Sequence, residues 1–129
     1  MKNIVFMTNI KDDNRINRSK PYEYSVKSWK QWCEKNDAEF FMLDEFIYEP
    51  DFMKPNWYKL YVFDLLENND IKYNQIAVVD ADTIVHPNCP NFFEMTENKF
   101  CAVPVHGSMD WVCRSMENYS KHLFNGFTF

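Results

Sequence analysis

Short apolar runs separated by polar segments recur along the chain and predict strands. They cover residues 4–7, 40–43, 76–79 and 100–105, each bounded by polar or turn-forming residues. The last run contains Pro104, which predicts an edge strand or an irregular end because proline donates no ladder hydrogen bond. The apolar runs are continuous rather than alternating, which is typical of parallel strands that are covered on both faces.

Between these runs, apolar residues recur every three or four positions and predict helices. The second helix begins at Pro55, since proline fits a first helical turn, and ends at Asn68–Asn69. The predicted apolar faces consist of Tyr22, Val26, Trp29 and Cys33 in the first helix, Tyr58, Tyr61, Val62 and Leu65 in the second, and Val112, Met116, Tyr119 and Leu123 in the last. Strands that alternate with helices predict an α/β fold with a mainly parallel sheet flanked by helices.

Length and charge limit the classes of protein that this chain can belong to. Its 129 residues are enough for one domain with a core of its own. The net charge of −5 argues against a partner bound through a basic surface, so we expect no nucleic acid. The apolar run near the N-terminus is too short for a signal peptide or a membrane span, and the expected location is therefore cytoplasmic.

The four cysteines do not form a recognisable metal or redox motif. Cys33, Cys89, Cys101 and Cys113 contain no Cys-x-x-Cys pair, and no histidine spacing completes a zinc pattern. We expect reduced thiols that are mostly buried. With only Gly107 and Gly126, the chain also has no glycine-rich loop for binding phosphate, so a nucleotide would have to be held in another way.

Two aspartates, Asp80 and Asp82, directly follow the apolar run 76–79. In open α/β sheets, ligands bind beyond the carboxyl ends of the strands, where these residues are expected to lie. If the chain stays extended, residues i and i+2 point to the same side, so both carboxylates could be presented together. Magnesium or manganese would relieve their repulsion and could hold phosphate oxygens. The alternative is a strand that ends in a solvated turn, with Asp82 capping the next element.

A longer stretch around these aspartates resembles a known family. Residues 57–94, WYKLYVFDLLENNDIKYNQIAVVDADTIVHPNCPNFFE, resemble the centre of a GT-A glycosyltransferase, and are most similar to the glycogenin-like family 8 enzymes and related galactosyl- and mannosyltransferases. Residues 3–9, NIVFMTN, resemble the first strand of that fold. Residues 22–43, YEYSVKSWKQWCEKNDAEFFML, resemble its first helix and second strand. The resemblance thus covers most of the chain and implies the GT-A fold, a Rossmann-like form of the α/β class.

The resemblance implies a role for each matching residue. Asp80 and Asp82 would bind manganese or magnesium, which bridges the diphosphate of a nucleotide sugar, and Asp80 could also reach the ribose. The backbone of Ala81 would lie close to the nucleotide. Lys59 matches a basic residue near the diphosphate or the sugar, where a cation stabilises the leaving nucleoside diphosphate. A solvated lysine on a helix is the alternative for Lys59.

The first strand would contribute to the same nucleotide site. Met7, Thr8 and Asn9 match the segment that lines the base and the ribose, although Thr8 and Asn9 could also form a plain turn. The implied activity is metal-dependent transfer of a sugar from a nucleotide-diphosphate donor, with UDP-sugar expected, to a hydroxyl of a glycan, protein or lipid acceptor. Residues 1–129 would form a single nucleotide-sugar-binding part of that domain.

Some features of the family are not found in this chain. A histidine towards the C-terminus completes the family's metal site, but none of His86, His106 and His122 matches its position. The apolar end of the sequence predicts a fold that is incomplete at its C-terminus, with a homo-oligomer or a missing C-terminal half as consequences. Two alternatives therefore stay open. They are a non-catalytic or truncated nucleotide-sugar-binding domain, and a haloacid-dehalogenase-like phosphatase with an aspartate nucleophile.

Overall fold

The structure, a computed structural model, describes residues 1–11, 16–49, 51–103 and 107–123. The elements in chain order are β1 (Lys2–Thr8), α1 (Ile16–Lys35), β2 (Ala38–Leu43), the 3₁₀ helix η2 (Pro55–Tyr61), α2 (Val62–Asn68), β3 (Tyr73–Asp80), α3 (Phe92–Met95) and α4 (Met109–Leu123). The chain divides into two compact units, Met1–Lys99 and Phe100–Phe129. The sheet and all helices except α4 belong to the first unit.

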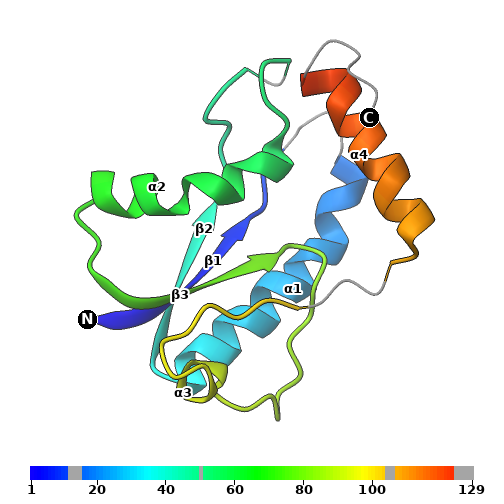
Figure 1. Cartoon of the computed structure of the whole chain (residues 1–129). Coiled ribbons are helices and arrows are strands. Elements are labelled where there is room, and N and C mark those ends of the chain that lie inside the picture. Colours follow the sequence, from blue (N-terminus) through cyan, green and yellow to red (C-terminus); the bar gives the residue numbers. More distant parts are fainter. Residues whose placement is uncertain (12–15, 50, 104–106, 124–129) are drawn as a thin grey trace. The chain divides into compact units, whose positions relative to one another are not determined.

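The three strands form one parallel sheet in the order β2-β1-β3 (Figure 1). In the register of the sheet, Thr8 at the end of β1 lies opposite Leu43 in β2 and Asp80 in β3. Because all three strands run in the same direction, their carboxyl ends meet at a single edge. The prediction of an α/β fold with a mainly parallel sheet flanked by helices is therefore confirmed for the described residues.

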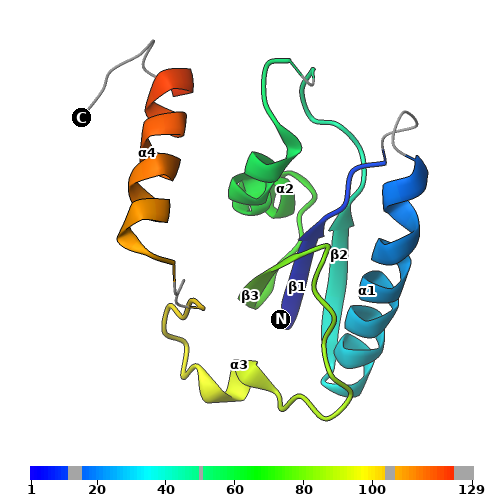
Figure 2. The ribbon, with the colours of Figure 1, turned by 90° about the vertical axis from the view of Figure 1, so that its right-hand side faces the viewer.

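Alternate residues of β1 enter two separate parts of the core. Val5 and Met7 pack with Trp29, Trp32 and Cys33 of α1. Ile4 and Phe6 face the other way and pack with Val62 and Leu66 of α2. The sheet accordingly lies between α1 and α2, as Figure 2 shows. The period of two along a strand explains this division, because successive side chains point to opposite faces.

The expectation of strands covered on both faces holds best for the central strand. In β1, the four residues from Ile4 to Met7 are each at most 1% exposed. Strand β3 is covered less completely, since none of its residues is fully buried and Val78 is 45% exposed. The apolar run 76–79 therefore predicted the strand correctly, but it did not predict how much of that strand is buried.

The expected strand at residues 100–105 is wrong where the structure describes it. Residues 100–103 have no regular structure, Phe100 and Val103 are exposed, and residues 104 and 105 lie outside the described residues. Apolar composition alone does not make a strand, because a strand also needs a neighbour to accept its backbone hydrogen bonds.

Two smaller differences concern helices. The segment that begins at Pro55 is a 3₁₀ helix up to Tyr61, and the single turn α3 was not expected.

The four cysteines are all free, and they differ in burial. Cys33 is buried in the core, where burial raises the pKa of its thiol to about 11. Cys89 is half-buried, whereas Cys101 and Cys113 are exposed. The expectation of mostly buried thiols is therefore wrong for the last two.

None of the described helices is both long enough and apolar enough to cross a bilayer.

Candidate functional site

The candidate site lies at the carboxyl edge of the sheet, where β1 and β3 end side by side. Thr8 and Asp80 are paired in the register of these two strands. The chain adds β2 on one side of β1 and then returns to add β3 on the other side. Such a reversal of strand order is where open α/β sheets characteristically bind ligands. The sequence predicts that Asp80 ends a strand. The structure shows that β1, ending at Thr8, is the strand beside it.

Lys59 and Asp80 form a close ion pair at this edge. The Lys59 Nζ donates a hydrogen bond to Asp80 Oδ1 at 2.5 Å, although the two residues are 21 positions apart in sequence. Both side chains are accessible, with 39% of the Lys59 side chain and 61% of the Asp80 side chain exposed. Two residues that the family resemblance assigned to the same site are thus in direct contact.

The placement of Lys59 depends on the buried residue that precedes it. Tyr58 is fully buried, and its hydroxyl both donates to the Tyr48 carbonyl at 3.0 Å and accepts from the Tyr48 amide at 3.1 Å. Three residues after Lys59, Val62 enters the core at 2% exposure. The backbone that carries Lys59 is therefore anchored on both sides, while its four-carbon side chain reaches the end of β3.

The chain turns immediately after Asp80. The Thr83 amide and hydroxyl both donate to the Asp80 carbonyl, at 3.1 and 2.6 Å, and close a turn over residues 80–83. Ala81 packs against the core while Asp82 is exposed. The expected extended geometry, with both carboxylates on one side of a strand, is therefore wrong, because the strand ends at Asp80. The aspartates are presented by a strand end and a tight turn.

Side chains of helix α1 hold this turn in place through hydrogen bonds. The buried Ser25 hydroxyl donates to the Thr83 carbonyl at 2.5 Å. The indole Nε1 of Trp29 lies 3.2 Å from the same carbonyl and 3.1 Å from the Thr83 hydroxyl oxygen. Further along, the Val85 amide donates to the Ser28 hydroxyl at 3.2 Å. The segment that carries Asp82 is consequently fixed by side chains of α1 that lie 54 to 58 positions before their partners in the sequence.

The end of β1 provides residues of quite different character. Met7 is fully buried, and its backbone lies in the central strand between Met42 of β2 and Val79 of β3. The expectation that Met7 lines a nucleotide site is therefore wrong, because a ligand cannot reach it. The Thr8 hydroxyl oxygen is buried and has no hydrogen-bond partner among the described residues. The side-chain amide nitrogen of Asn9, Nδ2, contacts Met42 Sδ at 4.0 Å. The backbone amide of Asn9 donates to the Leu43 carbonyl at 2.9 Å. Of the three, Thr8 has unused hydrogen-bonding capacity next to Asp80.

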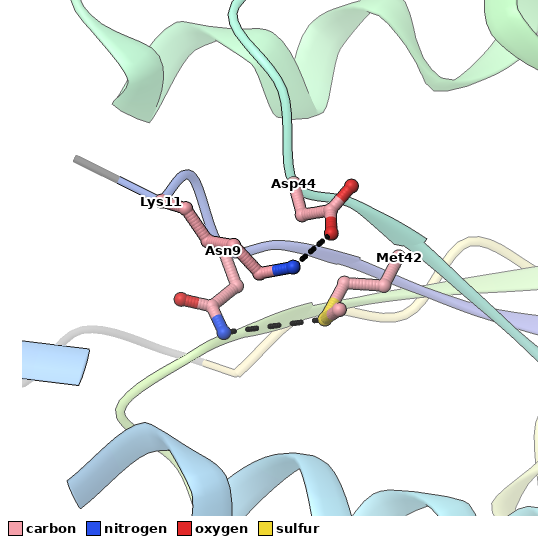
Figure 3. A network of polar contacts seen from close by, with 4 residues as sticks. All are labelled: Asn9, Lys11, Met42 and Asp44. Atoms are coloured by element: carbon pink, nitrogen blue, oxygen red, sulfur yellow. Dashed lines mark hydrogen bonds and ion pairs between the residues drawn. The ribbon is translucent and has the colours of Figure 1, made fainter. Parts of the chain in front are cut away.

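A second ion pair connects the segments that follow β1 and β2 (Figure 3). Lys11 Nζ lies 2.8 Å from Asp44 Oδ2, and the Lys11 amide donates to the Asp44 carbonyl at 3.1 Å. The side-chain hydrogen bond from Lys11 Nζ to Asp44 Oδ2 raises the pKa of Lys11 and lowers the pKa of Asp44. The carboxyl edge of the sheet therefore has two ion pairs among the described residues, this one on the β1–β2 side and Lys59–Asp80 on the β1–β3 side.

Two carboxylates at the β1–β3 edge, those of Asp80 and Asp82, are of the chemical type that could hold a divalent cation. Asp80 and Asp82 provide carboxylate oxygens, which magnesium and manganese prefer. Across the described residues, no three His, Cys, Asp or Glu side chains are grouped to hold a metal ion. His86 Nδ1 accepts a hydrogen bond from the Asn88 amide at 3.1 Å within its own loop, and His106 lies outside the described residues.

Sequence reasoning missed the residues that support the site. Ser25 and the pair Lys11–Asp44 were not singled out, and Trp29 was assigned only to an apolar helix face. One signal was present, because Ser25 lies four residues before Trp29 and is a polar residue on the buried side of that helix. A buried polar residue normally has a hydrogen-bonding task, here at Thr83.

Comparison with known proteins gives no relative for this chain: no family model, curated protein or solved structure matches it. Its function is therefore argued from the geometry of the site and from the sequence resemblance alone.

Proposed function

We propose that this chain is the nucleotide-sugar-binding part of a metal-dependent glycosyltransferase with a GT-A fold, and that its donor is a UDP-sugar. The observation that carries the proposal is the meeting of Thr8, Lys59 and Asp80 at one edge of a parallel sheet. The sequence resemblance assigns all three to the nucleotide site. The parallel sheet flanked by helices is compatible with this fold.

In this proposal, each charged group acts on the diphosphate. Asp80 and Asp82 hold manganese or magnesium, which supplies positive charge that stabilises the departing nucleoside diphosphate. Lys59 adds a second cation at the same place, where it stabilises charge that develops on the phosphate oxygens. The partly exposed Thr8 and Asn9 would face the ribose and the base, whereas the fully buried Met7 would not contact the nucleotide. Turnover further requires an acceptor hydroxyl on a glycan, a protein or a lipid.

Calorimetric titration of the full chain with UDP, in the presence and absence of manganese, tests the donor site. We expect UDP binding that depends on manganese and that weakens at least about tenfold in Asp80→Ala and in Asp82→Ala, because each change removes a charged oxygen ligand. Asp51→Ala is the matched control, since it removes an exposed aspartate from the loop before η2. Equal binding in all four proteins would show that the aspartates only end a strand.

A turnover measurement separates a transferase from a binding module. Release of UDP from UDP-glucose and UDP-galactose, followed with manganese and without an added acceptor, reports hydrolysis by the donor site. Manganese-dependent release that is lost in Asp82→Ala supports an enzyme. Tight UDP binding without any release, even with added oligosaccharide acceptors, supports the non-catalytic alternative.

A further inference from the structure

The ion pair between Lys59 and Asp80 occupies a carboxylate that the proposed function assigns to a metal ion. The 2.5 Å separation of Lys59 Nζ and Asp80 Oδ1 is that of a close, charge-assisted hydrogen bond. Asp80 therefore already has a cationic partner that belongs to the chain itself. A divalent cation that approaches the same carboxylate must either displace this ammonium group or remain beside it.

The cost of leaving the ammonium group in place follows from elementary electrostatics. A divalent ion and a lysine ammonium about 5 Å apart repel each other even at the dielectric constant of water, by an amount that lowers the affinity for the metal on the order of tenfold. Both side chains are partly exposed, so water and salt screen this repulsion without abolishing it. The metal alone is thus expected to bind poorly while Lys59 stays on Asp80.

A diphosphate changes this balance because it offers Lys59 another anionic partner. The η2 backbone is anchored by the buried Tyr58, but the long lysine side chain can change rotamer without moving that backbone. We infer that Lys59 is an internal counter-ion that competes with the metal for Asp80 and transfers to the diphosphate when both ligands bind. Metal and nucleotide therefore strengthen each other's binding through Lys59. This inference rests on the proposed function and concerns the regulation of the same site.

Separate titrations of manganese and UDP into the full chain and its Lys59→Met variant test the inference. Methionine retains most of the aliphatic side chain and removes the charge. In the variant, manganese alone should bind about fivefold to tenfold more tightly, because the competing cation is absent. UDP at saturating manganese should bind about tenfold more weakly, because the diphosphate loses a cationic partner. The two affinities are thus expected to change in opposite directions.

Two further variants define the controls. Lys2→Met removes the same charge from the ion pair with Asp37, at 3.2 Å, at the opposite end of β1, and should leave both affinities unchanged. Lys59→Arg keeps the positive charge and should retain the weak binding of manganese alone. It also reports on the charge if Lys59→Met does not fold, which circular dichroism would show.

The outcomes distinguish this inference from the function on which it rests. UDP binding that depends on manganese, together with equal affinity of wild type and Lys59→Met for manganese alone, would overturn the inference and leave the proposed function standing. If no variant binds manganese with or without UDP, the proposed function fails and the inference fails with it. A loss of both affinities in Lys59→Met would show that the lysine only supports the fold of the site.

Discussion

At the scale of single residues, the most informative group is the Thr8 hydroxyl. Its oxygen is buried and has no partner among the described residues, although it lies at the strand end opposite Asp80. Leaving a buried hydroxyl without a hydrogen bond costs about 1–3 kcal/mol, so such a group is rare unless something else uses it. A ribose hydroxyl or a phosphate oxygen would supply the missing hydrogen bond only after the groups that cover this oxygen move aside.

We predict that Thr8→Val separates stability from binding. Valine has nearly the shape of threonine but has no hydroxyl, so the free energy of unfolding should rise by about 1 kcal/mol. The affinity for UDP with manganese should fall about fivefold, because the ligand loses a hydrogen bond. Urea unfolding and calorimetry measure the two quantities on the same protein.

Thr83→Val is the matched control for that experiment. The Thr83 hydroxyl donates to the Asp80 carbonyl at 2.6 Å and lies 3.1 Å from Trp29 Nε1, so its loss should lower the free energy of unfolding by about 1–2 kcal/mol. Opposite effects on stability are therefore expected from the same substitution at the two positions. A similar loss of stability in both variants would mean that the Thr8 hydroxyl has a structural partner.

At the scale of elements, α1 acts as the support for the segment that follows β3. Side chains on successive turns of α1 form hydrogen bonds with backbone groups of that segment. The pairs are Ser25 and Trp29 with Thr83, Ser28 with Val85, Lys35 with Pro87, and Trp32 with Cys89. These bonds end on backbone groups, which fixes the path of the segment regardless of its own side chains. The turn that presents Asp82 is the part closest to the proposed site.

We predict that Ser25→Ala loosens this turn. The variant loses the 2.5 Å hydrogen bond to the Thr83 carbonyl and keeps the longer one from Trp29. The free energy of unfolding should fall by about 1 kcal/mol, and the affinity for UDP with manganese should fall about threefold, since Asp82 is held less firmly. Ser28→Ala, whose partner Val85 lies further from Asp82, should lower stability with little effect on affinity. Unchanged affinity in Ser25→Ala would contradict the supporting role of α1.

The elements themselves could largely be predicted from the sequence, for physical reasons. The strands β1, β2 and β3 have apolar runs between polar boundaries, and α1 and α4 show apolar residues at helical spacing. The prediction of a strand at 100–103 is wrong, because an apolar run does not reveal whether a partner strand exists. The sequence did not predict the 3₁₀ form of Pro55–Tyr61 either, because apolar residues in so short a segment fit a 3₁₀ helix and an α-helix equally well.

The site was less predictable than the elements that carry it. The position of Asp80 at a strand end could be predicted from the preceding apolar run. Its pairing with Thr8 depends on strand order, and its contact with Lys59 spans 21 positions, so no local pattern contains either fact. The resemblance to a family assigns both residues to one site, but it does not predict that they form an ion pair. The ion pair of Lys11 with Asp44, 33 positions apart, was missed for the same reason.

At the scale of the whole molecule, the core and the candidate site belong to one unit. All described side chains that are buried lie between Ile4 and Phe93, which is within Met1–Lys99. The proposed site also falls entirely within that unit, since it extends from Thr8 to Asp82. The second unit, Phe100–Phe129, contains the amphipathic helix α4 and none of these groups. Folding and ligand binding are thus expected to be properties of residues 1–99.

We predict that a protein ending at Lys99 folds cooperatively and keeps the donor site. Its free energy of unfolding in urea should stay within about 1 kcal/mol of the value for the full chain, because the buried apolar surface is retained. Its affinity for UDP with manganese should be unchanged within about twofold, because all proposed ligands are present. Full stability with lost binding would instead assign a ligand to residues 100–129, where His106 and His122 lie. Alanine variants of these two histidines in the full chain would then identify it.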